Sequence, residues 1–566
     1  MSSKSFAARG PRGRAVLAVA LGCVALGPVA AYADDTAEEI RLLKAQLRKL
    51  EAKVDAQARE ERRQASAVKT QAAKAQAAKA QAASTGGSGA GMPTVAIAPL
   101  TGAPAYGVAA RRAAVTGMPT NGSPSLFING VSITPGGFLA MEGVYRSRFV
   151  GADIATPFQN IPYGNVRTGQ TDEFRFSARQ SRASLLVKGD VDPQTHLSGY
   201  AEMDFLGAAQ TANSNESNSF NPRLRHLYAA ADWDSVGLHL LAGQTWSLAT
   251  ADAKGIMPRQ EILPLGIEAQ YVPGFVWTRT PQVRLVGELG GGFWAGVSAE
   301  SPATTFGGYT TVGTEADTLP STLVYNAAPP GGSLFNSANA ISLNHIPDIL
   351  GKVAYDASLA GHDVHLEAFG VYRDFYSQVN NYNYNVSGGG GGGSIAVAIV
   401  PKMLEAQFSG MTGRGIGRYG AGQLPDVTFN WNGTLAPISE TMLLAGVTYH
   451  PLPGLDLYAY AGQETQNATY STTYNADGSA NPFGLGNPLF VNSGCWTPGS
   501  TACSGMVRRL RQITGGFWQK IYQGDFGQLR VGMQYSFTQK TGFNAVGGAA
   551  NASENILLGS LRYYPF

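Results

Sequence analysis

The sequence predicts an all-β membrane protein, a 16-stranded antiparallel transmembrane β-barrel with an N-terminal coiled-coil helix. Segments from residue 136 onward alternate apolar with polar side chains, as strands that separate lipid from water do. The connections alternate between short turns and long loops. Charged residues make up only 14%, glycine is abundant at 71 residues, and no apolar run long enough for a membrane helix follows the N-terminus.

The N-terminus has the organisation of a secretory signal, which we assign to residues 1–33. Basic residues precede an apolar run at 15–31, and a small-x-small cleavage site ends at Ala33. An uncleaved anchor is the alternative. The pattern predicts export of the chain from the cytoplasm.

Residues 34–83 are predicted to form a coiled coil followed by a helical spacer. The coiled coil rests on apolar residues spaced by three and four, namely Ile40, Leu43, Leu47, Leu50 and Val54. A helix packed on its own protein is the alternative. Residues 69–83 repeat a five-residue alanine-rich unit without that apolar seam. Residues 84–130 are rich in glycine, alanine and proline and are expected to be a flexible linker.

The barrel itself is expected over residues 131–566. Its sixteen predicted strands are 136–148, 173–189, 196–207, 223–232, 236–246, 274–288, 292–300, 347–357, 363–374, 394–400, 403–413, 439–450, 455–465, 510–522, 528–539 and 555–566. An even number closes a bacterial barrel, with short turns facing the periplasm and long loops facing outside. This arrangement places both barrel ends, and therefore the coiled coil, in the periplasm.

The alternation is clearest at residues 173–207. Arg175 and Arg179 share one face of the first segment, and Phe174 and Phe176 share the other. The pattern slips near Arg182, whose direction the sequence does not settle.

Several short motifs resemble one family, the DcaP-like outer-membrane channels. They are FSARQSR at 176–182, GQTWS at 243–247, GRGIGRY at 413–419, YAYAGQE at 458–464 and the terminal LRYYPF. The terminal aromatic is typical of outer-membrane barrels, although Ser560 and Arg562 stand where apolar residues are usual and an ordinary final strand is the alternative. The resemblance spans residues 34–566. It implies a homotrimeric porin in the outer membrane of a Gram-negative bacterium, importing small anionic solutes such as dicarboxylates and related aromatic acids.

Arginine placement supports anion transport independently. A charge facing lipid costs about 2–4 kcal/mol near the midplane, so arginines spaced by two should point inward. Their fixed fork of donors matches a carboxylate, and a narrow pore strengthens their field. The predicted solute-binding arginines are Arg146, Arg175, Arg179, Arg223, Arg225 and Arg284, with Arg259 from a loop at 247–273 that is expected to fold into the lumen.

Each of these readings has an alternative. The arginines could balance acidic neighbours such as Glu142, Glu202 and Asp204, and the loop at 247–273 could be an ordinary surface loop. Cys495 and Cys503 lie close together in an exported chain, which favours a disulfide over a metal pair.

Other functions find little support. Outside the signal and residues 34–83 the chain has 27 basic and 31 acidic residues, so its bulk charge does not predict nucleic-acid binding. No Walker loop, HExxH or GxSxG motif occurs, and neither an enzymatic activity, a metal nor a cofactor is predicted. The remaining alternatives are an anchor that contacts the cell wall through the coiled coil, and a phosphate-selective porin.

Overall fold

The structure is a computed structural model that describes residues 117–119, 123–207, 221–308, 312–313, 318–327 and 341–566. The predicted signal peptide at 1–33 and the predicted coiled coil and spacer at 34–83 lie outside the described residues, as does most of the predicted linker at 84–130. These assignments therefore stay predictions. Among the described residues, no helix is both long and apolar enough to cross a membrane.

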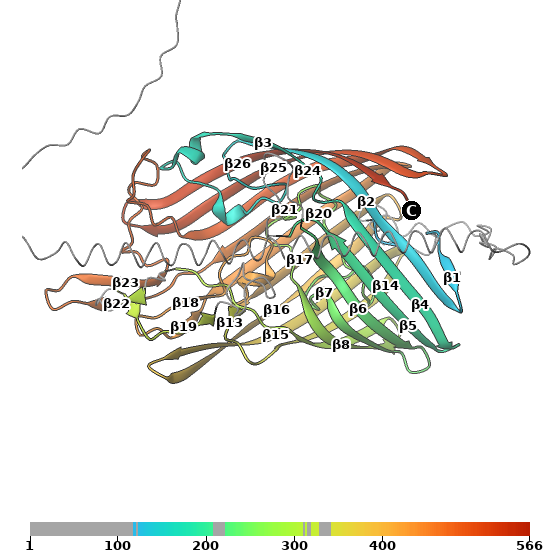
Figure 1. The fold of residues 1–566 in the computed structure, drawn as a ribbon, viewed down its shortest axis with the longest axis horizontal. Helices are drawn as coiled ribbons and strands as arrows, with labels where there is room; N and C mark the ends of the chain where they lie inside the picture. The colour runs from blue at the N-terminus through green and yellow to red at the C-terminus, as the bar shows by residue number, and fades with distance from the viewer. Residues whose placement is uncertain (1–116, 120–122, 208–220, 309–311, 314–317, 328–340) are drawn as a thin grey trace, which may run out of the picture. The chain divides into compact units, whose positions relative to one another are not determined.

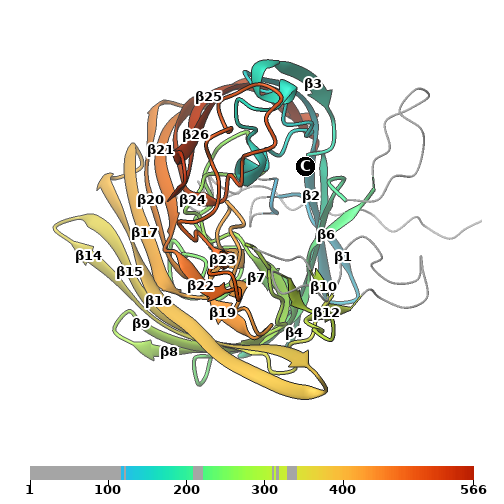
Figure 2. The same cartoon turned by 90° about the vertical axis from the view of Figure 1, so that its left-hand side faces the viewer.

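The described chain forms a closed antiparallel barrel, which confirms the predicted architecture (Figures 1 and 2). Its strands are β2 (Val131–Arg146), β3 (Glu173–Ser177), β4 (Arg182–Asp192), β5 (Thr195–Asp204), β6 (Arg223–Trp233), β7 (Leu238–Trp246), β8 (Arg279–Gly290), β9 (Phe293–Glu300), β14 (Asp348–Leu359), β15 (His362–Val379), β16 (Tyr382–Val400), β17 (Leu404–Arg414), β20 (Ser439–Leu452), β21 (Leu455–Gln466), β24 (Val507–Gly524), β25 (Gly527–Ala545) and β26 (Gly548–Tyr564). Pairing of β2 with β26 closes the ring, and β3 and β4 together form one of its sixteen strands because both pair with β2.

The interruption between β3 and β4 corrects the single strand expected at 173–189. Ser181 in the gap accepts a hydrogen bond from the Ala140 backbone N–H at 2.9 Å. Gln180 turns into the lumen and donates to the Ile267 carbonyl at 2.5 Å. Arg182 then points inward, where it lies 3.6 Å from Glu202. The slip in the sequence pattern near Arg182 therefore marks a break in the strand.

Side chains alternate between lipid and lumen as predicted. Phe174 and Phe176 are 58% and 62% exposed on the outside, whereas Glu202 on β5 is buried inside. The two residues that break the terminal apolar pattern also face inward: Ser560 and Arg562 both donate to Glu142, at 3.0 and 2.6 Å. Their polarity therefore belongs to the lumen side of β26.

The glycine-rich strand β16 is longer than the predicted segment at 394–400. Its glycines pair with β15 and β17 through the backbone alone, so they leave no alternating side chains for a sequence reading to detect. A Cβ added at Gly392 would lie 2.3 Å from the Gly410 carbonyl oxygen, which shows how closely the strands approach there.

The two ends of the barrel differ in their connections. One end has short turns, and the other carries the long loops L1 (147–172), L3 (247–278), L4 (301–347), L6 (415–438) and L7 (467–506). A short strand, β1 (Leu126–Ile128), pairs with β2. The loops contain the remaining elements, which are η1 (Phe158–Asn160), η2 (Arg167–Gln170), β10 (Val312–Gly313), β11 (Leu319–Pro320), β12 (Asn326–Ala327), β13 (Ile341–Ser342), η4 (Gly417–Tyr419), β18 (Val427–Phe429), β19 (Leu435–Pro437), β22 (Thr469–Tyr474) and β23 (Ala480–Leu485).

The apolar core of the molecule lies inside the barrel. Leu263, Leu265 and Ile267 of L3 pack with buried residues from the wall, including Tyr458 and Trp518. Loop segments inside the ring are visible in Figure 2, where the barrel is viewed end-on. The loops therefore fill much of the interior of the barrel.

Candidate functional site: an arginine-lined constriction

L3 folds into the lumen, as the sequence predicts. It leaves the wall between β7 and β8, yet its Leu265 N–H donates to the Tyr460 hydroxyl of β21 at 3.1 Å. The Trp518 indole of β24 donates back to the Leu265 carbonyl at 2.8 Å. The Ile267 N–H donates to Gln534 of β25 at 2.5 Å. Because β21, β24 and β25 are far from β7 and β8 in the order of the ring, L3 crosses the interior.

A buried ionic cluster fixes the first part of L3. The Lys352 ammonium on β14 donates to Asp252 of L3 at 2.9 Å, to Glu367 of β15 at 3.0 Å and to the Thr250 carbonyl at 2.7 Å. His365 also lies 3.1 Å from Glu367. Lys352 and Glu367 have no exposed side-chain surface. This cluster holds L3 against the wall near β14 and β15.

A polar crevice of about 30 Å³ separates L3 from the wall built by β4, β5, β6 and β26. L3 contributes the backbone of 264–266 together with Glu268 and Tyr271. The wall contributes Gln180, Asp204 and the three guanidiniums of Arg182, Arg225 and Arg562. The crevice is therefore the place where the lining charges and the constricting loop meet.

Positive charge exceeds negative charge on this wall. Glu202 accepts from Arg225 at 2.5 Å and lies 3.6 Å from Arg182. Asp204 pairs with Arg225 at 3.0 Å and with Arg223 at 2.7 Å. The guanidiniums of Arg182, Arg223 and Arg225 thus share two carboxylates, those of Glu202 and Asp204.

Arg279, at the start of β8, adds a further cation that the sequence reading missed. Its guanidinium lies 4.6 Å from the centre of the Trp246 ring. Within the described part of the chain it has no carboxylate within 4 Å, and its buried Nη1 has no hydrogen-bond partner. The guanidiniums of Arg225 and Arg223 repel it, whereas the Asp204 carboxylate attracts it. Arg279 therefore adds positive charge to the lumen without a carboxylate of the described chain beside it.

The positive electrostatic potential of this wall changes the pKa of Tyr271 in L3. Burial of the Tyr271 hydroxyl by itself would raise its pKa, but the nearby Arg225, Arg182 and Arg279 guanidiniums outweigh that effect and lower the pKa. Arg225 also donates to the Tyr271 hydroxyl at 3.4 Å. The wall guanidiniums therefore favour negative charge at the Tyr271 hydroxyl.

The seven predicted arginines divide into three groups. Arg225 lines the crevice, and Arg223 is paired with Asp204, which also lines it. Arg146 and Arg284 are buried in structural contacts: Arg146 pairs with Glu173 at 2.9 Å and donates to L1 carbonyls, and Arg284 donates to the Trp246 carbonyl at 2.6 Å.

The other three are partly exposed. Arg175 lies 3.4 Å from Glu173, and Arg179 lies 3.2 Å from Asp153 of L1. Arg259 of L3 lies 5.9 Å from the centre of the Tyr200 ring.

Three wall arginines escaped the sequence reading for different reasons. Arg182 follows the strand break, so its face was not predictable. Arg562 stands in the terminal strand beside Ser560, and this departure from an apolar pattern was the available signal. Arg279 is an odd number of residues from Arg284, so alternation along the predicted strand 274–288 placed it on the opposite, outward face.

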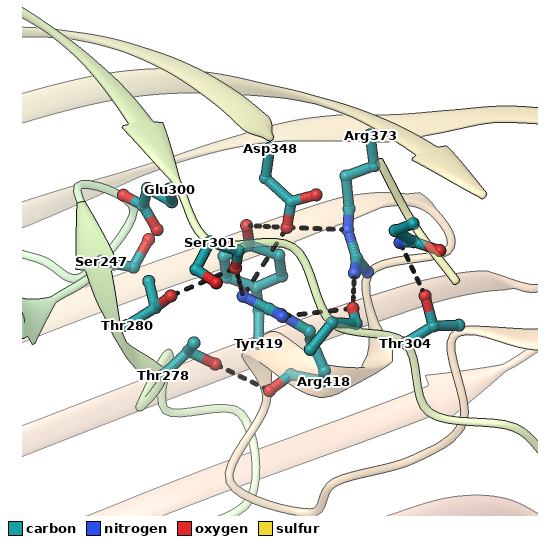
Figure 3. Close-up of polar contacts among 12 residues, drawn as sticks. Ser247, Thr278, Thr280, Glu300, Ser301, Thr304, Asp348, Arg373, Arg418 and Tyr419 are labelled. Atoms are coloured by element: carbon teal, nitrogen blue, oxygen red, sulfur yellow. Dashed lines mark hydrogen bonds and ion pairs between the residues drawn. The ribbon is translucent and has the colours of Figure 1, made fainter. Parts of the chain in front are cut away.

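A second arginine cluster joins L4 and L6 to the wall (Figure 3). Asp348 accepts from Arg373 at 3.1 Å and from the Tyr419 hydroxyl at 3.0 Å, and lies 3.6 Å from Arg418. Arg373 also pairs with Asp426 of L6 at 2.6 Å. The side chains of Arg373, Asp348 and Asp426 are fully buried. These paired charges organise the loops and are closed to solutes.

L7 is held by the disulfide between Cys495 and Cys503, whose Cα atoms are 4.7 Å apart. Cys495 packs with Ile161 and Tyr163 of L1. The described residues contain no cluster of His, Cys, Asp and Glu able to hold a metal ion.

No family model and no characterised protein sequence matches this chain. Among solved structures, the outer membrane channel DcaP of Acinetobacter baumannii aligns with a TM-score of 0.51 at 17% identity, over 77% of this chain and 98% of that chain. The chain has the fold of a DcaP-like outer-membrane porin. Pseudomonas putida OprB aligns less closely, with a TM-score of 0.41 at 8% identity over 76% of this chain and 94% of that chain.

The DcaP-like fold confirms the resemblance carried by the short sequence motifs. The terminal LRYYPF forms the end of β26 and the residues that follow it, and GQTWS forms the end of β7 and the start of L3. Both motifs therefore lie where the barrel closes or where the constricting loop begins.

Proposed function

We propose that this chain is an outer-membrane porin through which small hydrophilic solutes diffuse, with a preference for anions. The observation that carries the proposal is the excess of positive charge on the lumen wall, where the guanidiniums of Arg182, Arg223 and Arg225 share two carboxylates and Arg279 adds a further guanidinium. Rings of charge lining a narrow pore set its ion selectivity.

The chemistry of the wall favours carboxylates among anions. Guanidinium groups offer paired N–H donors that match the two oxygens of a carboxylate. Arg223 is 31% exposed and already holds Asp204 in this two-point manner, at 3.0 and 2.7 Å. Small carboxylates, including dicarboxylates and related aromatic acids, are therefore the proposed solutes.

The proposal includes a homotrimer in the outer membrane of a Gram-negative bacterium, with the predicted coiled coil at 34–83 in the periplasm. The trimer and the coiled coil rest on the resemblance and on the heptad pattern in the sequence. A coiled coil attached to the periplasmic end could also contact the cell wall, so the anchoring role remains the alternative function.

Zero-current potentials in planar bilayers test the proposal. Under a KCl gradient we expect the wild type to favour chloride, and Arg279→Gln to shift the potential toward zero. Arg167→Gln is the matched control, because Arg167 is exposed in η2 of L1. Salts of mono- and dicarboxylic acids, with phosphate in a parallel arm, then rank the solutes. A cation-selective wild type, or equal potentials for Arg279→Gln and wild type, would overturn the proposal.

A further inference from the structure

The outward face of β17, β20, β21, β24 and β25 changes character toward the end that carries the long loops. Along most of its height this face is apolar, with residues such as Phe408, Leu443 and Ile513 exposed. Near the loop end the outward side chains become polar or cationic. We call these residues the outer polar band, and they are Arg414, Thr441, Gln463, Arg509, Arg511 and Gln539.

The direction of the two β24 arginines follows from their strand. Leu510 and Gln512 face the lumen and are 0% and 1% exposed, whereas Ile513 faces outward and is 68% exposed. Arg509 and Arg511 share the outward side with Ile513 because side chains alternate along a strand. In the ladder, Arg511 stands between Gln463 of β21 and Gln539 of β25.

An outward charge places this part of β24 at the membrane surface. Arginine on the lipid face costs about 2–4 kcal/mol at the midplane but only about 0–1 kcal/mol near the interface. Both arginines lie within the first residues of β24, directly after the long loop L7. The outer polar band therefore faces the headgroup layer on the side of the long loops, which is the outer leaflet in the orientation that the loop lengths indicate.

The two cations are not neutralised by the described chain. No carboxylate of a described residue lies within 4 Å of Arg509 or Arg511. Arg511 donates from Nε to the neutral Gln463 amide at 2.6 Å, and Arg509 has a buried Nε without a partner. This contrasts with the lumen, where Glu142, Glu202 and Asp204 pair with most of the crevice arginines.

An apolar groove adjoins these cations. It has a volume of about 420 Å³, and Arg511, Gln463 and Gln539 form its polar part. Its floor is recessed because Ala445 and Ala461, paired across β20 and β21, have small side chains. Phe408, Ile513 and Phe537 supply its larger apolar sides.

From these observations we propose that the groove and Arg509 with Arg511 form a binding site for a phosphorylated lipid of the outer leaflet. An acyl chain would occupy the groove, and a lipid phosphate would accept hydrogen bonds from the two guanidiniums. Gln463 and Gln539 flank that position and can bind hydroxyl or carbonyl groups of the same headgroup. Basic side chains that face a headgroup layer attract anionic lipid in this manner.

The test uses the full-length protein purified in a neutral detergent and titrated with bis-phosphorylated lipid A, with bound lipid counted by native mass spectrometry. Loss of two cations near a lipid surface should weaken binding by about 30-fold in the double variant Arg509→Gln, Arg511→Gln. Arg167→Gln, which removes an exposed loop cation, should bind as the wild type does. A heat-modifiability gel of each variant confirms that the barrel is folded.

A second variant separates the groove from the charges. Ala461→Leu fills the groove floor without altering charge, so it should also weaken the binding of lipid A. Lipid A from which the phosphates have been removed should bind the wild type and the double arginine variant equally. Equal lipid A binding by the wild type and the double arginine variant would overturn the proposal. Full competition by inorganic phosphate would also overturn the proposal, because it indicates a site for free anions. A loss of oligomers without a change in lipid binding would overturn it as well, because it indicates a contact between copies of the chain.

Discussion

Replacing Lys352 by methionine should release L3 from the barrel wall. The ammonium contacts Asp252, Glu367 and the Thr250 carbonyl together, and its side chain has no exposed surface. Methionine keeps much of the volume but removes the charge. Asp252 and Glu367 then remain buried close to each other without the cation between them.

The expected loss of stability follows from the cost of removing one partner of a buried ion pair, which is about 3–5 kcal/mol. If that cost falls on the attachment of L3, the equilibrium for local opening shifts roughly a hundred- to several-thousand-fold. Protonation limits the loss, because burial raises the pKa of Asp252 and removal of Lys352 leaves that carboxyl free to take up a proton. The effect should therefore be smaller at pH 5 than at pH 8.

Hydrogen exchange measured by mass spectrometry is the direct assay. Peptides from 248–270 should exchange faster in Lys352→Met, while peptides from β24 and β25 should be unchanged. Lys254→Met is the matched control, since Lys254 lies in the same loop but is exposed. The triple variant Lys352→Met, Asp252→Asn, Glu367→Gln should recover part of the protection. Unchanged exchange in Lys352→Met, or a triple variant as unprotected as the single one, would refute the reasoning.

Two further predictions concern other contacts of L3. Burial raises the pKa of Glu268, so the stability that this group contributes is present at low pH and is lost as the pH rises through the raised value. Lowering the pH from 8 to 5 should therefore raise the thermal midpoint more in the wild type than in Glu268→Gln. Equal shifts of the two midpoints would contradict this. A Cβ at Gly462 would lie 1.9 Å from the Pro273 carbonyl oxygen, so Gly462→Ala should cost about 1–3 kcal/mol in urea unfolding, whereas Gly559→Ala, where nothing lies within 4 Å, should cost little.

The fold was predictable because lipid and water impose a period of two on every strand. That period identified the outward Phe174 and Phe176 and the inward Glu202, and it indicated sixteen strands. It failed where side chains carry no such information, as in the glycine run of β16, and where a strand is interrupted, as before Arg182.

The site was predictable only in part, because the direction of a side chain does not tell what that side chain contacts. Arg146 and Arg225 both point inward as predicted, yet Arg146 is taken up by L1 and Glu173, whereas Arg225 lines the crevice. The difference depends on loops that return from far along the sequence. Arg279 shows the converse: an isolated arginine without a repeating neighbour acquires its setting only when β8 lies beside Trp246 and the wall of β6.

We propose that the degree to which the chain neutralises each arginine separates structural from ligand-binding roles in this barrel. A buried guanidinium without a carboxylate is costly, so a chain that needs only stability would pair it or replace it by an apolar residue. Arg373 meets this expectation, with Asp348 and Asp426 both in contact. Arg279 in the lumen and Arg509 on the outer face do not, because neither has a carboxylate of a described residue within 4 Å. The same deficit on two faces points to two kinds of anion, a diffusing solute inside and a lipid phosphate outside. If neutralising Arg279 altered lipid binding but left permeation unchanged, or if neutralising Arg509 did the reverse, this division of roles would be wrong.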